Sequence, residues 1–519
     1  MAVLALFPIC IVLAGFALVV HHSAVYFWDA KRLRKYPTLN PLCGVTNLGY
    51  ILQLWRSDKF RTRSMTQAHR ENNVIRIGPN ALSFSDVGAI QDIYGHSTTC
   101  VKGDMYSTPA GPYRSILDSV DKQEHSQKRK RLSAAFATKH LEGWEHKIVD
   151  KCNRLIAQFD QHCTSSMDAK RGVKEDTIDL RKWFNLFTVE AIADIALSEH
   201  LGLLEGGTDT VVVSDQTGNR RCVQFIPSVH GVGRMAAPIV WSRNGYATFK
   251  QVATLLSTSY ANEVRNNSNY DDIVRHMTLR RLQRHNSGEK IDDLFTCLVE
   301  DKQGTATGLP VGDIAAEVSV FMNAGSDTTA IALTHVLYYL LKNSDRLRRL
   351  REEIDNCIES DTVIPAYADV KTLPYLKACL DESLRLSPPV SFGLERKTPP
   401  EGASINGEWV AGDVMVSVPA YVAHRDSSIF PNPEEYIPER WLMEESKTVQ
   451  KYFIPFSTGA RGCIGRNISY IEQHVLLAAL VKRYEFALPY VEWELRWEER
   501  FNLWPSAMPL RMWRRTRQM

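Results

Sequence analysis

The residues with the clearest chemical potential form one ten-residue stretch, Phe456 to Gly465, with the sequence FSTGARGCIG. Within it, Cys463 follows the permanent positive charge of Arg461 and precedes an apolar repeat that predicts a helix. Unpaired N–H groups at a helix N-terminus stabilise a thiolate. Gly459 permits a turn with positive φ, and Phe456 could cover the sulfur side of a flat cofactor. The stretch therefore predicts a cysteine thiolate that could be an axial metal ligand.

A lone cysteine in a glycine-rich turn is more often inert, but this one stands in a longer pattern. Five residues match the F-x-x-G-x-R-x-C-x-G pattern of the cytochrome P-450 family: Phe456, Gly459, Arg461, Cys463 and Gly465. The chain resembles this family from about Pro37 to its C-terminus. The resemblance implies haem b with Cys463 as the axial ligand of iron, a ligand that favours O–O cleavage. It also implies a single large domain, mainly α with small β-sheets.

A second motif, AGSDTT at Ala324 to Thr329, lies inside an apolar stretch that predicts a helix. Glycine and polar residues are costly in the middle of a helix. Taken alone, the motif favours a threonine hydroxyl that bonds back to its own helix. The resemblance to the family's oxygen-activation motif implies more: Gly325 lets oxygen approach or opens the helix, Thr328 holds a water, and Asp327 delivers protons.

Glu382 and Arg385 are three residues apart in a predicted helix, so their side chains meet on one face. An exposed pair of this kind contributes only about 0.3 kcal/mol to the stability of a helix. The pair resembles the family's E-x-x-R motif, and Pro438 to Trp441 resembles its partner segment. The resemblance implies that Glu382, Arg385 and Arg440 form a buried structural network that steadies the cysteine loop.

Haem carries two propionates, and a guanidinium pairs with a carboxylate in a bidentate geometry. His125 and Arg129 match the H-x-x-x-R pattern of many fungal family members. The resemblance implies that both residues, with Arg396 and Arg461, contact the propionates.

Composition limits the other classes of function. The 519 residues have a hydrophobic content of 44%, enough for a buried core, and a net charge of +3, too small to indicate a nucleic-acid partner. The ten cysteines include no C-x-x-C pair, which argues against a zinc site or a disulfide scaffold. A globular protein in a reducing compartment is therefore expected, with no nucleic acid bound.

An apolar run from Ala2 to Val20 is long enough to span a bilayer, and no charged residue precedes Asp29. A cleaved signal peptide is the alternative, but its basic n-region is missing. Positive residues follow the run, which predicts a cytosolic catalytic domain on the endoplasmic reticulum membrane, held by a single transmembrane helix. We expect the anchor at residues 1–28, a basic, proline-containing linker at 29–43 and the catalytic domain at 44–519.

Reducing equivalents must come from another protein. Gly231 to Ala236 fits the loose G-x-G-x-x-A pattern, but no βαβ unit surrounds it, and no flavin region is evident. The resemblance implies an NADPH-cytochrome P-450 reductase on the same membrane, with cytochrome b5 as a further electron donor.

Substrate residues are predicted by position: Phe321, Asn323, Ala324, Val390, Phe392, Leu394, Phe501 and Leu503. Their apolar bias favours a lipophilic substrate, such as a terpenoid or polyketide of fungal secondary metabolism. The resemblance implies a monooxygenase that hydroxylates, epoxidises or further oxidises it. Two alternatives remain: a haem-thiolate isomerase or dehydratase that needs neither O₂ nor reductase, and a non-enzymatic membrane haem-binding protein.

Overall fold

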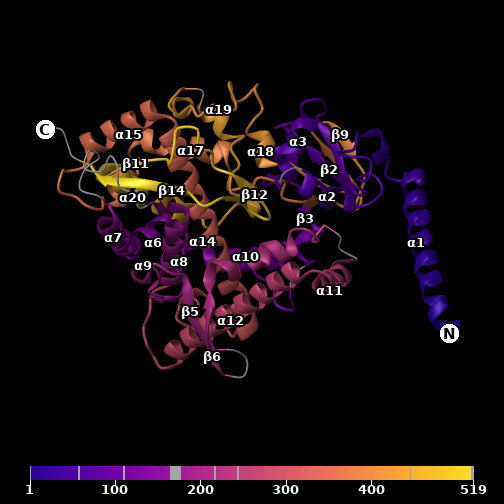
Figure 1. Ribbon diagram of the computed structural model, residues 1–519, viewed down its shortest axis with the longest axis horizontal. Helices are drawn as coiled ribbons and strands as arrows, with labels where there is room; N and C mark the ends of the chain where they lie inside the picture. The colour runs from indigo at the N-terminus through magenta and orange to yellow at the C-terminus, as the bar shows by residue number, and fades with distance from the viewer. Residues whose placement is uncertain are drawn as a thin grey trace.

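Helices dominate the computed structural model, which describes residues 2–56, 59–108, 111–163, 177–214, 218–241, 245–444 and 446–515 (Figure 1). The side chains of residues 2–14, 55 and 56 are also outside this description. The expected anchor therefore lies partly outside the described residues, although its backbone is helical.

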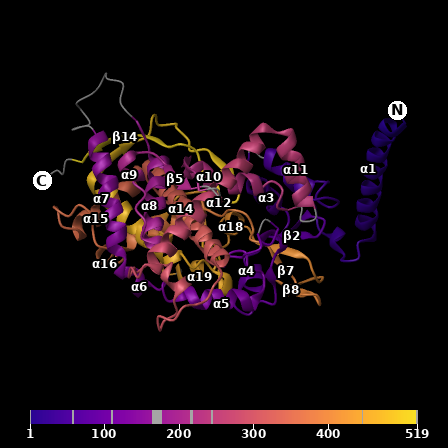
Figure 2. The ribbon, with the colours of Figure 1, turned by 90° about the horizontal axis from the view of Figure 1, so that it is seen from below.

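The helices in chain order are α1 Ala2–Trp28, α2 Leu48–Arg56, α3 Arg61–His69, α4 Ala89–Tyr94, α5 Lys122–Ser133, α6 Thr138–Gly143, α7 Glu145–His162, α8 Leu180–Leu197, α9 Leu203–Gly206, α10 Phe225–Ala236, α11 Tyr246–Leu256, α12 Thr258–Asn286, α13 Thr296–Val299, α14 Val311–Lys342, α15 Ser344–Cys357, α16 Tyr367–Val370, α17 Pro374–Leu386, α18 Ala420–Ala423, α19 Ser446–Gln450 and α20 Arg466–Arg483. In two views at right angles, α1 stands apart from the other elements (Figures 1 and 2). Across the part of the chain whose side chains are described, no helix combines the length and apolarity needed to cross a membrane.

The helix α14 is the central element of the core. Pro310 precedes it, where the missing N–H of proline costs nothing. Residues 329–338 are buried on every face, as expected for a helix that is apolar all round. It packs against α8, α17 and α20, so it holds the AGSDTT motif and the start of the cysteine-loop helix in one core.

The largest sheet has five strands in the order β1-β2-β10-β7-β3. The strands are β1 Val74–Gly78, β2 Ala81–Phe84, β3 Val101–Lys102, β7 Arg396–Lys397 and β10 Met415–Ser417. Strands β3 and β7 are antiparallel, and their register places Lys102 opposite Arg396. The sheet therefore brings two cations from distant parts of the chain to one place.

The remaining strands form smaller sheets. A three-stranded sheet has the order β11-β14-β4, and three hairpins pair β5 with β6, β8 with β9 and β12 with β13. Their bounds are β4 Ile178–Asp179, β5 Thr210–Ser214, β6 Arg220–Gln224, β8 Ala403–Ile405, β9 Glu408–Val410, β11 Tyr484–Ala487, β12 Trp497–Glu499, β13 Leu503–Pro505 and β14 Pro509–Arg514. Strand β13 packs on α14, which brings the turn of its hairpin to the AGSDTT motif. The prediction of a mainly α fold with small sheets is confirmed.

Candidate active site

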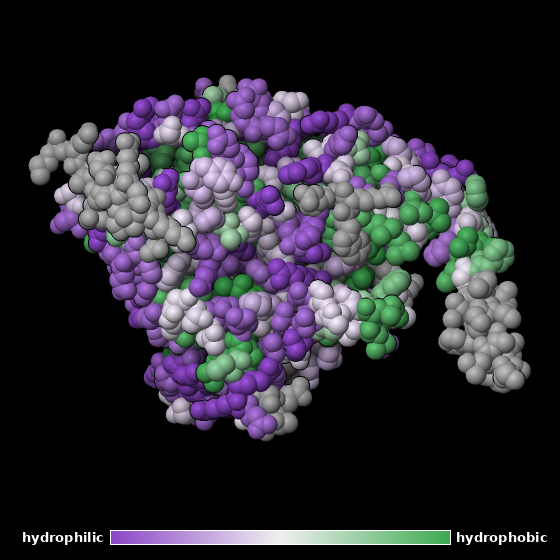
Figure 3. Space-filling view, in the orientation of Figure 1, coloured by the Kyte–Doolittle hydropathy of each residue, from purple (hydrophilic) through white to green (hydrophobic). Residues whose placement is uncertain are grey.

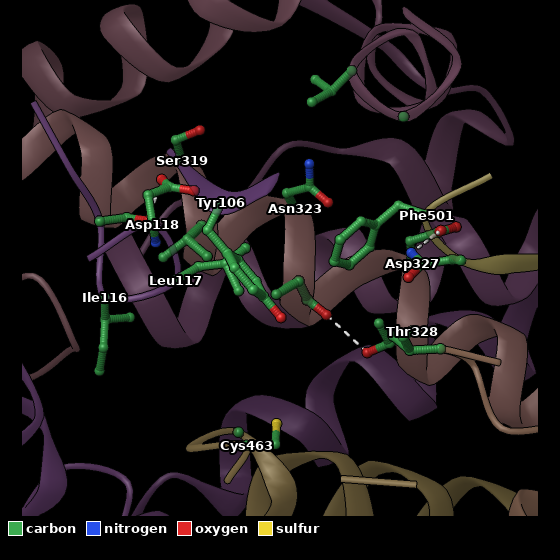
Figure 4. A pocket seen from close by; sticks show the side chains of 18 of the residues that line it. Tyr106, Ile116, Leu117, Asp118, Ser319, Asn323, Asp327, Thr328, Cys463 and Phe501 are labelled. Carbon is green, nitrogen blue, oxygen red and sulfur yellow. Dashed lines mark hydrogen bonds between the residues drawn. The ribbon is translucent and has the colours of Figure 1, made fainter. Parts of the chain in front are cut away.

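A cavity of about 1090 Å³ lies beside α14. Its walls come from α14, α10, the segment that leads into α5, the strands β3 and β7, and the loop that leads to α20. Cys463 enters it from one side, and Thr328 and Asn323 face it from the α14 side (Figure 4). The structure therefore brings the two sequence motifs to one space.

The cysteine loop is held in a fixed turn. Gly459 has φ 70°, and a Cβ added there would lie 2.0 Å from the carbonyl oxygen of Tyr94, so no side chain fits at this position. The N–H of Cys463 donates to the carbonyl of Phe456 at 2.8 Å, and Gly465 is the N-cap of α20. The ring of Phe456 lines the cavity and packs against Tyr470, with 5.3 Å between ring centroids.

Among the described cysteines, Cys463 is the one that lines the cavity. Its thiol is accessible from the cavity, whereas protein atoms surround it on the other sides. This burial raises the pKa of Cys463, although N–H groups of Gly465 and Arg466 and the charge of Arg129 act to lower it. A coordinated metal ion deprotonates a thiol outright. The sulfur therefore needs a cation on its cavity side to persist as a thiolate.

Four predicted propionate contacts lie together at one wall of the cavity: His125, Arg129, Arg396 and Arg461. Arg129 donates to the carbonyl of Gly462 at 2.6 Å, and Arg461 donates to the carbonyl of Ser119 at 2.6 Å. Burial, together with Arg461 and other nearby cations, lowers the pKa of His125 to about 3, so this imidazole is neutral.

Lys102 lines the same wall and was not predicted from the sequence. It is buried, stands opposite Arg396 in the sheet and donates to the backbone carbonyls of Ile116 and Leu117. Among the described residues it forms no ion pair with a carboxylate. Burial, and then the charges of Arg461 and Arg396, lower the pKa of Lys102 to about 7. No motif marks this lysine, because its position depends on the register of β3 against β7.

Gly325 lies in an unbroken part of α14, so the local helix opening expected from the motif is not present. The physical reason for glycine is packing: an added Cβ would lie 2.6 Å from the side chain of Ile192 on α8. Gly325 also lines the cavity. The prediction that it lets oxygen approach stays a prediction.

Thr328 donates its hydroxyl proton to the carbonyl of Ala324 at 2.8 Å, the bond back to its own helix that the motif alone suggests. Its oxygen keeps acceptor capacity toward the cavity.

The carboxylate of Asp327 accepts four hydrogen bonds. Oδ1 accepts from Arg181 at 2.9 Å and from His230 at 3.0 Å. Oδ2 accepts from Asn502 at 2.8 Å and from Trp504 at 2.5 Å. Burial alone would raise the pKa of Asp327, but His230 and Arg181 outweigh it and hold this pKa well below its usual range. At rest the carboxylate is therefore ionised, and it points toward the β12–β13 hairpin and α10.

Glu382, Arg385 and Arg440 meet in the buried network expected from the sequence. Arg385 donates from Nε and from a terminal nitrogen to the two oxygens of Glu382, both at 2.9 Å. Arg440 donates to Glu382 at 3.0 Å, and the indole N–H of Trp441 donates to it at 2.9 Å. All polar positions of the carboxylate are thus engaged.

His424 connects this network to the cysteine loop. Its Nδ1 lies 3.1 Å from the carbonyl of Arg385, and its Nε2 accepts from the N–H of Ile454 at 2.9 Å, two residues before Phe456. Burial and the charge of Arg385 lower the pKa of His424 to about 3, which keeps the ring neutral with one donor and one acceptor. In the sequence, His424 begins the triplet His424-Arg425-Asp426, which matches no catalytic motif.

The comparisons with known proteins agree with this geometry. The family model for cytochrome P-450 matches residues 45–503. The chain belongs to the cytochrome P-450 family. Benzoate 4-monooxygenase bphA of Aspergillus niger is 29% identical over 91% of this chain and 92% of its own. Cytochrome P-450 monooxygenase 1 of Neocamarosporium betae is 30% identical, over 80% and 79%. Tryprostatin B 6-hydroxylase of Aspergillus fumigatus is 28% identical, over 90% and 79%.

A cytochrome P-450 monooxygenase binds haem through a cysteine thiolate, and the cavity fits this group. Its wall carries four basic side chains: Lys102 and Arg396 are buried, and Arg129 and Arg461 are partly buried. Among the described residues, none of the four pairs with a carboxylate at hydrogen-bond distance. Buried charges normally require counter-charges, and two propionates would supply them. Cys463 would then hold the iron from the side of the cysteine loop.

Seven of the eight predicted substrate residues line the cavity: Phe321, Asn323, Ala324, Val390, Phe392, Leu394 and Phe501. Leu503 does not, so this prediction was wrong. Successive side chains of a strand point to opposite sides. Asn502 and Trp504 face the cavity, and Leu503 points into a core cluster with Phe60 and Tyr421.

Proposed function

We propose that this monooxygenase inserts one atom of O₂ into a lipophilic substrate of fungal secondary metabolism, with Cys463 as the axial ligand of haem iron. This proposal rests on one observation: Cys463 and Thr328 line one largely apolar cavity whose wall also holds the basic side chains of Lys102, Arg129, Arg396 and Arg461. When bound, the haem supplies the iron at which O₂ is split and an oxygen atom enters a C–H or C=C bond. The isomerase and non-enzymatic alternatives give Asp327 and Thr328 no task.

Thr328 and Asp327 would manage protons in this reaction. The Thr328 hydroxyl donates its hydrogen bond to the carbonyl of Ala324. Its oxygen can therefore accept a hydrogen bond from a cavity water. Asp327 is adjacent in the chain and also lines the cavity. A proton that reaches Asp327 could then pass through such a water to the reacting oxygen.

Thr328→Val is expected to lower the yield of oxidised product per NADPH by about a hundredfold, the low end of general acid–base effects. NADPH consumption continues and hydrogen peroxide accumulates, because oxygen is reduced without productive protonation. Product is measured by mass spectrometry with aromatic acids, terpenoids and polyketides as test substrates, and peroxide is measured in parallel.

The matched control is Thr334→Val. Thr334 bonds to the carbonyl of Ala330 at 2.7 Å on the same helix, but it lies outside the cavity. Unchanged coupling in Thr328→Val would contradict the role given to Thr328. Absence of product from the wild-type protein would support the non-enzymatic alternative, and turnover without NADPH would support the isomerase.

The substrate class rests on the cavity lining. Aromatic and aliphatic side chains dominate near Thr328, and Asn323 and Ser319 add polar groups on α14 (Figure 4). The similar proteins include enzymes named for oxidising benzoate and tryprostatin B. We therefore propose a mainly apolar terpenoid or polyketide.

Electrons would come from an NADPH-dependent diflavin reductase, with cytochrome b5 as a further donor. The G-x-G-x-x-A segment belongs to the helix α10, where it packs on α12 and β13, and cannot form a dinucleotide-binding turn. We expect activity when a reductase is added together with NADPH and no activity with NADPH alone. Activity with NADPH alone would contradict the need for a separate reductase.

We propose that the apolar run 2–20 anchors the enzyme to the endoplasmic reticulum, with the catalytic domain in the cytosol. Exposed apolar side chains also gather on α2 and α11: Leu48, Leu52, Phe249, Val252, Leu255 and Leu256. These surfaces and the end of α1 lie on the same side of the molecule (Figure 3).

Deletion of residues 2–28 is expected to release the protein from membranes at alkaline pH, because the longest apolar run is lost. Fractionation of cell membranes, with and without carbonate, measures the effect. Full-length protein that stays in the soluble fraction would contradict the anchor.

A further inference from the structure

The partners of Asp327 differ in their ability to exchange protons. A guanidinium is protonated at all physiological pH values, and neither an amide nor an indole N–H ionises there. Arg181, Asn502 and Trp504 can therefore hold the carboxylate but cannot pass it a proton. An imidazole can do both. Among these four donors, His230 is the one through which Asp327 can be protonated.

The position of His230 suits an exchange with solvent. Its side chain is 13% exposed, compared with 3% for Asp327 and 7% for Arg181. It is not among the residues that line the cavity, so its exposed part lies outside this cavity. While Nε2 bonds to Asp327, Nδ1 has no hydrogen-bond partner within the described part of the chain.

The ring of His230 is also held in place. It stacks on Trp504, with 4.2 Å between centroids and 26° between planes, and Trp504 itself donates to Asp327. Gly233, one turn further along α10, brings that helix close to the same indole: an added Cβ would lie 3.3 Å from it. The imidazole thus cannot turn away from Asp327 without repacking α10 on β13.

We propose that His230 relays protons from the solvent to Asp327, and through it to the oxygen chemistry at Thr328. The inference rests on the proposed roles of Asp327 and Thr328. Nδ1 takes a proton from a hydronium ion, and the imidazolium gives its Nε2 proton to Oδ1 of Asp327. An O–H bond of the hydronium ion breaks as the Nδ1–H bond forms, and the Nε2–H bond breaks as the O–H bond of Asp327 forms, with no change of oxidation state. After Asp327 has passed its proton on, Nδ1 gives its proton to water and Nε2 takes one from water, which restores the first tautomer.

The charged groups around His230 and Asp327 favour a proton that passes through Asp327 without staying on it. Arg181 from α8 holds Asp327 as the anion, so a proton does not stay on it. Arg234, on α10, lies over the ring of Trp504 at 5.1 Å and is 3.9 Å from Glu263 of α12. No other acid among the described ion pairs competes for the imidazole of His230.

The test is His230→Gln in the holoenzyme. A glutamine amide can keep an N–H bond to Asp327 but cannot relay a proton. NADPH-driven O₂ consumption with added reductase is measured in H₂O and D₂O, without an organic substrate. We expect a rate about tenfold lower than wild type and a larger solvent isotope effect. This loss is smaller than the loss of about a hundredfold or more typical of a direct general acid, because His230 acts through Asp327. The control is His96→Gln, because His96 is exposed and does not line the cavity.

A second reaction separates the relay from a structural role. Cumene hydroperoxide brings its oxygen already reduced, so guaiacol oxidation driven by it should be preserved in His230→Gln. A wild-type O₂ rate and isotope effect in the variant would overturn the proposal, as would equal losses in both reactions. If wild-type enzyme itself consumes no NADPH, the proposed function fails instead.

Discussion

Replacing Cys463 by alanine is expected to abolish the thiolate-type haem spectrum and to reduce NADPH-driven product formation to background. Alanine offers no ligand to iron, and among the described cysteines no other lines the cavity. The basic side chains of Lys102, Arg129, Arg396 and Arg461 remain in the cavity wall, so some haem could still be held by its propionates. Absorbance of the purified variant, haem content per protein and product analysis measure the outcome.

Cys357→Ala is the control for this variant, because Cys357 is exposed at the end of α15. It should leave the spectrum and the activity unchanged. A thiolate-type spectrum that survives in Cys463→Ala would mean that another cysteine binds the iron.

Glu382→Gln is expected to destabilise the folded protein by about 3–5 kcal/mol, the usual cost of leaving a buried charge without its partner. Arg385 is completely buried and Arg440 nearly so, and the amide nitrogen of glutamine would face their N–H donors. A natural domain has only about 5–15 kcal/mol of stability. Little holoprotein should therefore accumulate, measured as haem absorbance per expressed protein and as the temperature of thermal inactivation.

The control is an exposed aspartate–arginine pair with the same three-residue spacing. Arg348 and Asp345 are 2.8 Å apart on α15, but their side chains are 70% and 68% exposed. Asp345→Asn should cost less than about 1 kcal/mol, because exposed pairs contribute little. An equal loss of stability in Glu382→Gln and Asp345→Asn would show that the buried network contributes no more to stability than an exposed pair.

The cysteine loop, the AGSDTT helix and the Glu382 network could be predicted because each is local in the chain. The positive φ of Gly459 and the three-residue spacing of Glu382 and Arg385 are properties of short segments. The same holds for His125 and Arg129 on one helix.

The remaining features depend on contacts between distant segments, which spacing alone does not encode. Lys102 joins the cationic wall through a strand register, and His424 reaches the cysteine loop through α17. Leu503 was misplaced because the phase of a short strand decides which side chain faces the cavity. His230 lies on α10, far in sequence from Asp327, and had no motif to mark it.

The most direct test is the spectrum of the reduced wild-type protein with carbon monoxide. We expect the red-shifted Soret band of thiolate-ligated haem, because Cys463 is the described cysteine that faces the cavity and the family binds haem in this way. A Soret band at the position typical of histidine-ligated haem, in protein that has retained its full haem content, would contradict it.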